Sequence, residues 1–250
     1  MTLKLILVMP TLNERIGLES IYHRLPINLF DRVVVVDAWS SDGTVEWCHE
    51  RNIEVFPQKV PGLRQGLVDF LSSLEENSMI LTFSPDGNCD PETLERFVKV
   101  IYAHPEARLV LGSRYAGGAT SEDDDFLTAF GNRFFTKACN FVFGSKFTDV
   151  FSIYRAFDSC LIHDLGLDEE DSYAWLERLL STKVPWEPLM SYRVAKYKVC
   201  WIDVPVGEPK RIGGERKLQV FRWGASFLLQ LLREIWYAPK SKRTKGNRKV

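Results

Sequence analysis

Short apolar runs alternate with longer segments of helical periodicity along the first half of the chain. The runs are rich in valine, isoleucine, leucine and phenylalanine, as is typical of strands buried on both faces of a parallel sheet. This alternation predicts a doubly wound, mostly parallel α/β sheet over about the first 115 residues. We expect strands at residues 3–9, 33–37, 53–56, 79–83 and 108–111, and helices at residues 14–25, 43–51, 62–74 and 91–103.

The second half of the chain is less regular. Residues 116–125 have the sequence AGGATSEDDD, which is typical of a flexible, acidic loop or a seam within a domain. A helix is expected at residues 126–143, a strand at residues 199–204 and short helices between them. We interpret residues 1–238 as one domain with two halves and a C-terminal helix. The halves are residues 1–115 and 116–217, the amphipathic helix is residues 218–238, and a basic tail follows at residues 239–250.

The C-terminal helix is apolar around most of its circumference. Its polar residues form one narrow stripe, made of Gln219, Arg222, Ser226, Gln230 and Arg233. Such a helix must bury most of its surface. It can pack on the body of the protein or on a second subunit of a homo-oligomer, or it can lie in the surface of a membrane.

The tail after Pro239 carries six lysines and arginines and no acid. Because the whole chain has a net charge of −1, the rest of the chain has a net charge of −7. A basic end on an acidic body favours an anionic partner, and each Lys or Arg close to anionic headgroups contributes ~1 kcal/mol. The tail lacks interleaved aromatic residues and a recognisable binding module, so we do not expect a nucleic acid as a partner.

Composition is that of an ordinary globular protein, with 250 residues, 45% apolar and 26% charged. The five cysteines are scattered, without a CxxC pair, which is typical of reduced residues and not of a disulfide framework or a zinc site. No apolar run reaches the ~18 residues of a membrane span. We therefore expect a cytoplasmic protein that contacts the cytoplasmic face of a membrane peripherally if its C-terminal helix lies there.

The turn SPDGN follows the strand expected at residues 79–83. Ligands of open α/β sheets bind outside the carboxyl ends of the strands. There the carboxylate of Asp86 and the amide carbonyl of Asn88 can share a hard cation, Mg²⁺ or Mn²⁺, that carries a phosphate. A solvated turn is the alternative, because Pro, Asp, Gly and Asn are the common turn residues.

The turns after the first two strands also suit a nucleotide. In PTLNE, at residues 10–14, Asn13 can cap a helix whose amides face a ligand. Asp37 follows four valines and can accept hydrogen bonds from a ribose or a base, while Asp42 is expected to cap the next helix. Neither GxGxxG nor GxxxxGK[ST] occurs, which argues against a dinucleotide-binding fold and against a P-loop.

These motifs together resemble the family 2 glycosyltransferases of the glycosyltransferase A fold, nearest the dolichol- or polyprenol-phosphate mannosyltransferases. PTLNE, VVVVDAWSSDGT, SPDGNCDPE and LGSRY occur in the family's order, and the likeness continues through GNRFFTKACNFVFG, TDVFSIYRAF and EPKRIGGERK. It covers about residues 3–218. The resemblance implies that residues 1–115 bind a nucleotide sugar and that residues 116–217 bind an acceptor.

The resemblance also assigns roles to individual residues. Asp86 and Asn88 fall on the positions that hold the metal, Mg²⁺ or Mn²⁺. Arg114 falls on the arginine of the GSRY motif, and Arg211 and Lys217 fall on the late basic residues. The residues implied to contact the donor are Pro10, Leu12, Glu14, Asp37, Pro85, Asp86, Arg114, Arg211 and Lys217.

Three positions depart from the family pattern. Ser84 stands where the metal turn has its first aspartate, and Ala38 stands where a second aspartate follows Asp37. Asn88 is one methylene shorter than the family's glutamine. The loss of two carboxylates weakens the negative field around a cation, so we expect a lower metal affinity than is usual for the family.

Cleavage of a nucleotide sugar leaves a charged diphosphate, which must be stabilised as its charge develops. A cation at Asp86, with Arg114, Arg211 and Lys217, would supply that stabilisation. A lipid phosphate acceptor is largely ionised at pH 7, because its second pKa is about 6, and needs no strong base. An acceptor hydroxyl needs one, for which the candidates are Glu177, Glu187 and Asp149. Glu187, between Trp186 and Pro188, is the candidate that we assign to the site; a helix N-terminal carboxylate is its alternative role.

The function expected from the sequence is therefore transfer of a hexose, mannose or glucose, from a nucleoside diphosphate to polyprenyl or dolichyl phosphate. Inversion at the anomeric carbon is implied by the resemblance. Two alternatives are transfer to a saccharide hydroxyl in cell-surface polysaccharide synthesis and, because of Ser84 and Ala38, a nucleotide-sugar-binding protein without activity.

Overall fold

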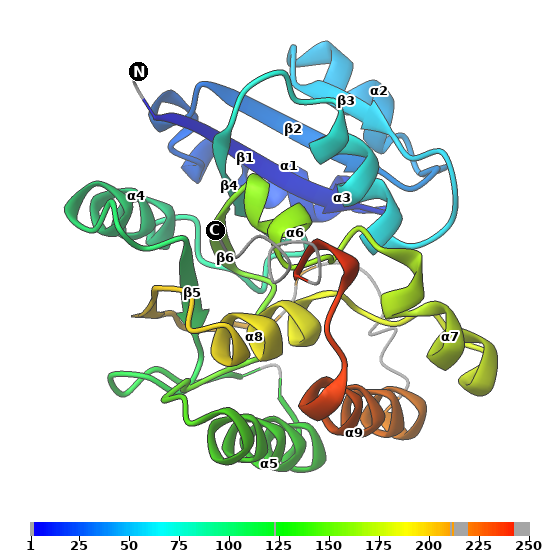
Figure 1. Cartoon of the computed structure of the whole chain (residues 1–250). Coiled ribbons are helices and arrows are strands. Elements are labelled where there is room, and N and C mark those ends of the chain that lie inside the picture. Colours follow the sequence, from blue (N-terminus) through cyan, green and yellow to red (C-terminus); the bar gives the residue numbers. More distant parts are fainter. Residues whose placement is uncertain (1–2, 123, 211, 213–219, 243–250) are drawn as a thin grey trace.

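The computed structural model describes residues 3–122, 124–210, 212 and 220–242. The strands in this part of the chain are β1 (Lys4–Thr11), β2 (Arg32–Asp37), β3 (Glu54–Pro57), β4 (Ser78–Thr82), β5 (Leu109–Ser113), β6 (Arg155–Asp158) and β7 (Trp201–Pro205). They form one sheet in the order β3-β2-β1-β4-β6-β5-β7, with helices on both faces (Figure 1). β6 is antiparallel to β4 and β5, whereas the other paired strands are parallel. The predicted α/β class with a mostly parallel sheet is confirmed.

Both faces of the sheet are covered, which explains the uninterrupted apolar runs. Along β1, Leu5, Leu7 and Met9 join one core, and Ile6 and Val8 join the other. The helices of the first half are α1 (Arg15–Ile21), α2 (Thr44–Glu50), α3 (Leu63–Ser72) and α4 (Thr93–Ala103). α1, α2 and α4 contribute to the first core, and α3 contributes to the second. The predicted helices of the first half occur where the sequence placed them, within a few residues at each end.

β6 is the one strand of the described sheet that the sequence pattern did not predict. It is four residues long and begins with Arg155, which is fully buried. Because β6 runs antiparallel, its first residue pairs with Thr82 and Leu111 near the ends of β4 and β5. The segment before β6 therefore lies at the same rim of the sheet as the turns that follow β4 and β5.

The second half of the chain supplies further helices, which are α5 (Phe126–Phe143), α6 (Cys160–Asp164), α7 (Ala174–Leu180), α8 (Glu187–Lys196) and α9 (Val220–Trp236). Of these, α5, α7, α8 and α9 lie in the lower part of Figure 1 and α6 lies near its centre. α8 is buried over nearly its whole length and contacts α5 and α9. α5 has the bounds that the sequence predicted.

α9 covers most of the predicted C-terminal helix; Leu218 and Gln219 lie outside the described residues. It packs on the body of the protein through a buried ion pair, in which Arg193 Nη2 lies 2.8 Å from Glu234 Oε1 and both side chains are at most 1% exposed. Ser226 and Gln230 of the predicted polar stripe are buried as well. Among the described residues, no helix is long and apolar enough to cross a membrane.

Residues 116–125 were expected to form a flexible loop, but their described part is attached to the body. The backbone N–H of Glu122 donates to Glu208 O at 2.8 Å, and that of Glu208 donates to Thr120 O at 3.1 Å. Asp125 caps α5 by accepting a hydrogen bond from the backbone N–H of Thr128 at 2.8 Å. This segment therefore forms a wall beside β5 and belongs to the site described next.

Candidate active site

The turn after β4 is buried, so a solvated turn is the wrong interpretation of it. Asp86 is 6% and Asn88 8% exposed, and the backbone N–H of Asn88 donates to Asp86 Oδ1 at 3.2 Å. Gly87 between them has φ +85°, which a residue with a side chain adopts only with strain. The side-chain oxygen Oδ1 of Asn88 is buried and has no hydrogen-bond partner within the described part of the chain.

This turn fits a divalent cation. The unpartnered Asn88 Oδ1 and the Asp86 carboxylate are hard oxygen ligands two residues apart in a buried turn. No group of three or more His, Cys, Asp or Glu residues that could hold a metal occurs among the residues that the structure describes. A cation here would thus have two protein side chains as ligands, as suits Mg²⁺ or Mn²⁺ that is also bound by substrate phosphates and water.

Neighbouring segments fix the position of the turn. α1 approaches it so closely that a Cβ at Gly17 would lie 2.2 Å from Pro85 O, which only glycine permits. From the other side, the backbone N–H of Ile212 donates to Asp86 O at 2.8 Å. Ile212, which follows Arg211 in the sequence, therefore lies beside the turn. Arg211 and Lys217 themselves lie outside the described residues, and their phosphate-binding role stays a prediction.

The predicted nucleotide-binding residues lie where β1 and β2 end. Asp37 is 4% exposed; its Oδ2 accepts from the backbone N–H of Ser40 at 3.0 Å, while its Oδ1 is buried with no hydrogen-bond partner in the described structure. Pro10 is half-buried and Leu12 is 36% exposed. Glu14, also half-buried, directly precedes α1. A ribose or base hydrogen-bond donor would satisfy Asp37 Oδ1, and this assignment remains a prediction.

Asn13 and Asp42 shape this rim. Asn13 does not cap α1 as expected: its Oδ1 accepts from the backbone N–H of Ser41 at 2.8 Å, which joins the turns after β1 and β2. Asp42 accepts from the backbone N–H of Thr44, at the start of α2, at 3.0 Å and from that of Arg15 at 3.1 Å. Its predicted role as the N-cap of α2 is wrong, because Gly43 occupies that position and no side chain among the described residues caps the helix.

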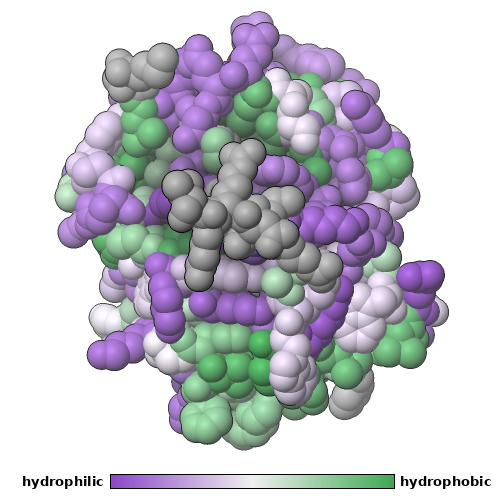
Figure 2. All heavy atoms as spheres, viewed as in Figure 1, coloured by the Kyte–Doolittle hydropathy of each residue, from purple (hydrophilic) through white to green (hydrophobic). Residues whose placement is uncertain are grey.

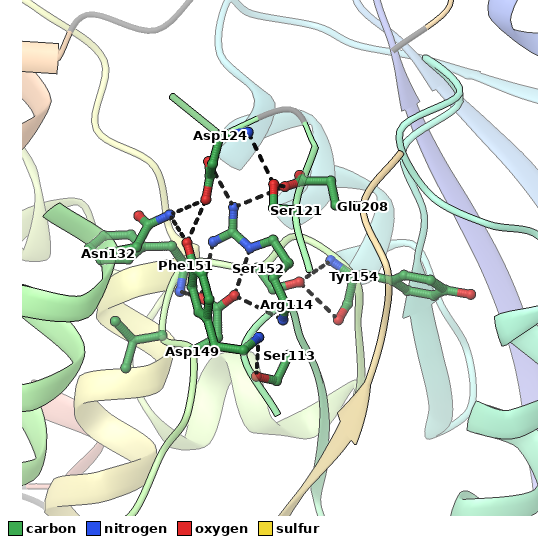
Figure 3. Close-up of polar contacts among 12 residues, drawn as sticks. Ser113, Arg114, Ser121, Asp124, Asn132, Asp149, Phe151, Ser152, Tyr154 and Glu208 are labelled. Carbon is green, nitrogen blue, oxygen red and sulfur yellow. Dashed lines mark hydrogen bonds and ion pairs between the residues drawn. The ribbon is translucent and has the colours of Figure 1, made fainter. Parts of the chain in front are cut away.

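Arg114, directly after β5, lies among three carboxylates (Figure 3). Asp149 binds it in two places, with Oδ2 2.7 Å from Nε and Oδ1 3.1 Å from Nη2. Nη1 lies 3.6 Å from Asp124 Oδ1 and 3.5 Å from Glu208 Oε2. The guanidinium is therefore held rigidly in the wall of the site, and its predicted contact with a phosphate would be made from this fixed position.

The pKa values of this pair follow from burial and charge. Burial alone would lower the pKa of Arg114, but the charge of Asp149 and its hydrogen bonds outweigh this effect and raise the pKa well above its usual range. Burial alone would raise the pKa of Asp149, but Arg114 and two backbone N–H groups lower it. Asp149 is thus a committed ion-pair partner and a poor general base.

A cavity of about 350 Å³ lies beside this cluster. Asn88 of the turn after β4 and Arg114 contribute to its lining. Thr128 and Asn132 of α5 line it too, as do Trp223 and Phe227 of α9. The cavity therefore extends from the proposed metal turn to α5 and α9.

Glu187 is the acid that the sequence favoured as a base, and it lines this cavity as the first residue of α8. It is 5% exposed, and its Oε2 is buried without a hydrogen-bond partner in the described residues. Burial raises its pKa, although the nearby Arg155 guanidinium opposes that rise. Glu177 does not line the cavity; it accepts from Lys183 Nζ at 2.9 Å and lies 3.3 Å from Arg64 Nη2. Of the three candidate bases, only Glu187 lines the cavity and has a carboxylate oxygen without a partner in the described residues.

Several residues of the site were not found by sequence reasoning. Asp124 was read as part of an acidic loop, but it is 5% exposed and accepts from Tyr115 and from Asn132, the latter at 3.1 Å. Arg155 is fully buried, donates to the backbone oxygens of Ser152 and Glu187, and has a pKa lowered to about 10 by burial. A buried arginine cannot be distinguished from a surface one by its neighbours in the sequence.

Comparison with solved structures defines the class of this fold. Glucosyl-3-phosphoglycerate synthase from Mycobacterium tuberculosis, solved in complex with Mn²⁺, UDP and phosphoglyceric acid, matches with a TM-score of 0.67 at 17% identity, over 95% of this chain and 80% of that one. The same enzyme solved with Mn²⁺ and UDP-glucose matches with a TM-score of 0.62 at 18% identity, over 95% and 80% of the two chains. This likeness shows the fold, which is the glycosyltransferase A fold.

The chain belongs to glycosyl transferase family 2, whose model matches residues 6–166. A glycosyltransferase of Haloferax volcanii named AglJ is 27% identical over 188 residues, which are 70% of this chain and 59% of that protein. An undecaprenyl-phosphate mannosyltransferase of Micrococcus luteus is 24% identical over 244 residues, 89% of this chain and 94% of that protein. This chain is therefore a family 2 glycosyltransferase, similar to the polyprenol-phosphate mannosyltransferases.

Proposed function

We propose that this enzyme transfers a hexose, mannose or glucose, from a nucleoside diphosphate to a polyprenyl phosphate, with inversion. The observation that carries the proposal is the cavity lined by Asn88 and by residues of α5 and α9. Its lining combines polar groups suited to a diphosphate and a sugar with aromatic side chains of α9, Trp223 and Phe227. The similarity to an undecaprenyl-phosphate mannosyltransferase supports an acceptor of this amphipathic kind.

The donor would lie across the ends of β1, β2 and β4. Asp37 would accept a hydrogen bond from the ribose or base, and Asp86 and Asn88 would hold Mg²⁺ or Mn²⁺. A bound cation would neutralise charge on the diphosphate as it leaves. Arg211 and Lys217, the basic residues on either side of Ile212 in the sequence, would add positive charge around the same diphosphate.

The acceptor phosphate would enter the cavity from the side of α5 and α9. One of its ionised oxygens attacks the anomeric carbon while the bond from that carbon to the diphosphate breaks, which inverts the configuration. No proton has to be removed from this nucleophile near pH 7, because the second pKa of a phosphate monoester is about 6. Burial raises the pKa of Glu187, which favours its uncharged form and so lessens repulsion of an incoming phosphate.

A second candidate is transfer to a saccharide hydroxyl. Glu187 supports it, because a buried carboxyl group with an unpartnered oxygen in the cavity is placed to accept a proton. Glu177 serves as the control acid for this role, because it is paired with Lys183 and Arg64 and does not line the cavity.

The two candidate functions differ in their acceptor, so an assay of sugar transfer to each acceptor distinguishes them. GDP- and UDP-linked mannose and glucose would each be incubated with Mn²⁺ and with no acceptor, a polyprenyl phosphate or a panel of oligosaccharides. We expect one donor to give a hexosyl lipid that depends on the polyprenyl phosphate. Transfer to an oligosaccharide, with none to the lipid phosphate, would contradict the proposal and establish the second candidate.

A further inference from the structure

The exposed side of α5 is its apolar side. Phe126, Phe130, Phe134 and Phe141 are 88%, 60%, 49% and 91% exposed. Their spacing of four, four and seven residues places them on one stripe of the helix. The side that faces the protein instead carries small and polar residues, of which Asn132 is 8% exposed. This is the reverse of the arrangement that a helix on a water-facing surface adopts.

α9, which contacts α5, shows the same reversal. Leu228, Leu232, Ile235 and Trp236 are 41%, 44%, 38% and 81% exposed. Facing inward, the same helix buries Ser226, Gln230 and Glu234 along with Phe227 and Leu231. The buried ion pair of Glu234 with Arg193 fixes this orientation, because rotation of the helix would leave a buried arginine unpaired.

The two exposed sides form one apolar surface. Phe135 of α5 and Phe227 of α9 pack edge to face, with ring centroids 5.9 Å apart. Figure 2 shows apolar side chains gathered at the end of the molecule where α5 and α9 lie in Figure 1. We name this surface the α5–α9 face and define it by the four phenylalanines of α5 and by Leu228, Leu232, Ile235 and Trp236. An exposed apolar group of this extent marks a site of contact with a protein or a membrane.

The charges beside the face distinguish these two partners. Residues 126–146 contain no aspartate or glutamate, and their cations, Arg133, Lys137 and Lys146, are all exposed. Two exposed acids, Glu122 and Asp125, precede Phe126, so that cations outnumber them around the face. Arg222 of α9 is exposed too, and Glu234, the one acid of that helix, is buried. A second copy of the chain would bring these like charges together. An anionic bilayer would attract them while accepting the apolar side chains.

We propose that the α5–α9 face inserts into the surface of an anionic bilayer, with both helices lying in the membrane plane. The proposal rests on the proposed function in one respect: it explains how a polyprenyl phosphate would reach the cavity. Thr128 and Trp223 line the cavity from α5 and α9, so both helices of the face border the cavity. The prenyl chain would stay in the bilayer while the phosphate enters.

The test compares two matched triple variants. The first is Phe126→Ser, Phe130→Ser and Phe141→Ser, which removes the most exposed phenylalanines. The control is Ile27→Ser, Tyr102→Ser and Leu179→Ser, whose side chains are 43%, 58% and 64% exposed outside the face. Thermal unfolding would check that both variants fold, and binding of a nucleoside diphosphate with Mn²⁺ would check the donor site.

Binding would be measured by co-sedimentation with phosphatidylglycerol and phosphatidylcholine vesicles that contain no polyprenyl phosphate. We expect the wild type and the control to sediment with anionic vesicles, and the phenylalanine variant to partition at least about tenfold less, with donor binding unchanged. The proposal is overturned if the wild type stays in the supernatant or if the phenylalanine variant binds equally well. It is also overturned if ultracentrifugation shows a dimer that this variant dissociates. Because these vesicles lack an acceptor, a failure of sugar transfer would leave the result unaffected.

Discussion

Replacing Glu187 with glutamine separates the two acceptor chemistries. The substitution keeps the size of the side chain and removes its charge and its ability to accept a proton. Glu187 is 5% exposed, and Arg155, fully buried, makes a hydrogen bond of 3.0 Å to its backbone oxygen. Loss of the carboxylate leaves Arg155 less well compensated, but it also relieves the cost of burying an anion. We expect these effects to offset one another, with a change in unfolding free energy below about 2 kcal/mol.

The effect on rate depends on the nucleophile. An ionised lipid phosphate needs no base, so Glu187→Gln should lower kcat by less than about tenfold, or ~1.4 kcal/mol. A hydroxyl acceptor would lose the general base, which costs about 10² to 10⁴ in rate, or ~3 to 5 kcal/mol. The pH profile differs as well, because burial raises the pKa of Glu187: hydroxyl transfer would increase with pH as this acid ionises.

The assay is steady-state transfer to polyprenyl phosphate and to oligosaccharide by the wild type, Glu187→Gln and the control Glu177→Gln. The control removes an acid that is paired with Lys183 outside the cavity. A loss above a hundredfold for Glu187→Gln with polyprenyl phosphate, with unchanged thermal unfolding and donor binding, would refute the reasoning. The reaction would then require a base even for this acceptor.

Three further predictions concern the metal turn, a buried acid and the tail. Asp86→Ala should remove Mn²⁺-dependent binding of nucleoside diphosphate while the protein stays folded, and equal affinity by calorimetry would contradict the metal assignment. Burial raises the pKa of Asp203 to about 6 from an ordinary 3.8, so the contribution of this group to stability is greatest below pH 3.8 and declines as the pH rises through about 6. Partly screened, this decline is about 2 kcal/mol, and urea titrations should find it absent in Asp203→Asn; an unchanged pH dependence would refute it. Deleting residues 243–250 should weaken binding to anionic vesicles at low salt, where the field of the tail extends farthest, without altering donor affinity; equal co-sedimentation would refute a role of the tail.

Local pattern was sufficient for most of the fold. The strands of the first half are uniformly apolar because both faces of the sheet are covered, and α5 has the predicted bounds. β6 was missed because its apolar residues, Ala156 and Phe157, form too short a run between Arg155 and Asp158 to predict a strand. The orientation of α9 could not be predicted either, because it depends on Glu234 meeting Arg193, 41 residues earlier in the chain.

Some residues of the candidate site could also be proposed from local sequence pattern, whereas others depend on contacts between distant segments. Asp86, Asn88 and Glu187 could be proposed from the sequence because each lies at the end of a regular element, and their roles stay predictions. The partners of Arg114 could not be proposed, since Asp124, Asp149 and Glu208 come from separate loops that meet only in the folded chain. That Asp149 is a fixed ion-pair partner, and so a poor base, follows from a contact across 35 residues that no local motif records.

Transfer of labelled hexose to a polyprenyl phosphate tests the central claim most directly. The purified enzyme would be incubated with a labelled nucleotide sugar, Mn²⁺ and polyprenyl phosphate in detergent, and the label extracted into the organic phase would be measured. We predict label in the lipid fraction that requires the acceptor phosphate and is lost in Asp86→Ala. Label that stays in the aqueous phase for every donor, while the same enzyme glycosylates a saccharide, would contradict the account.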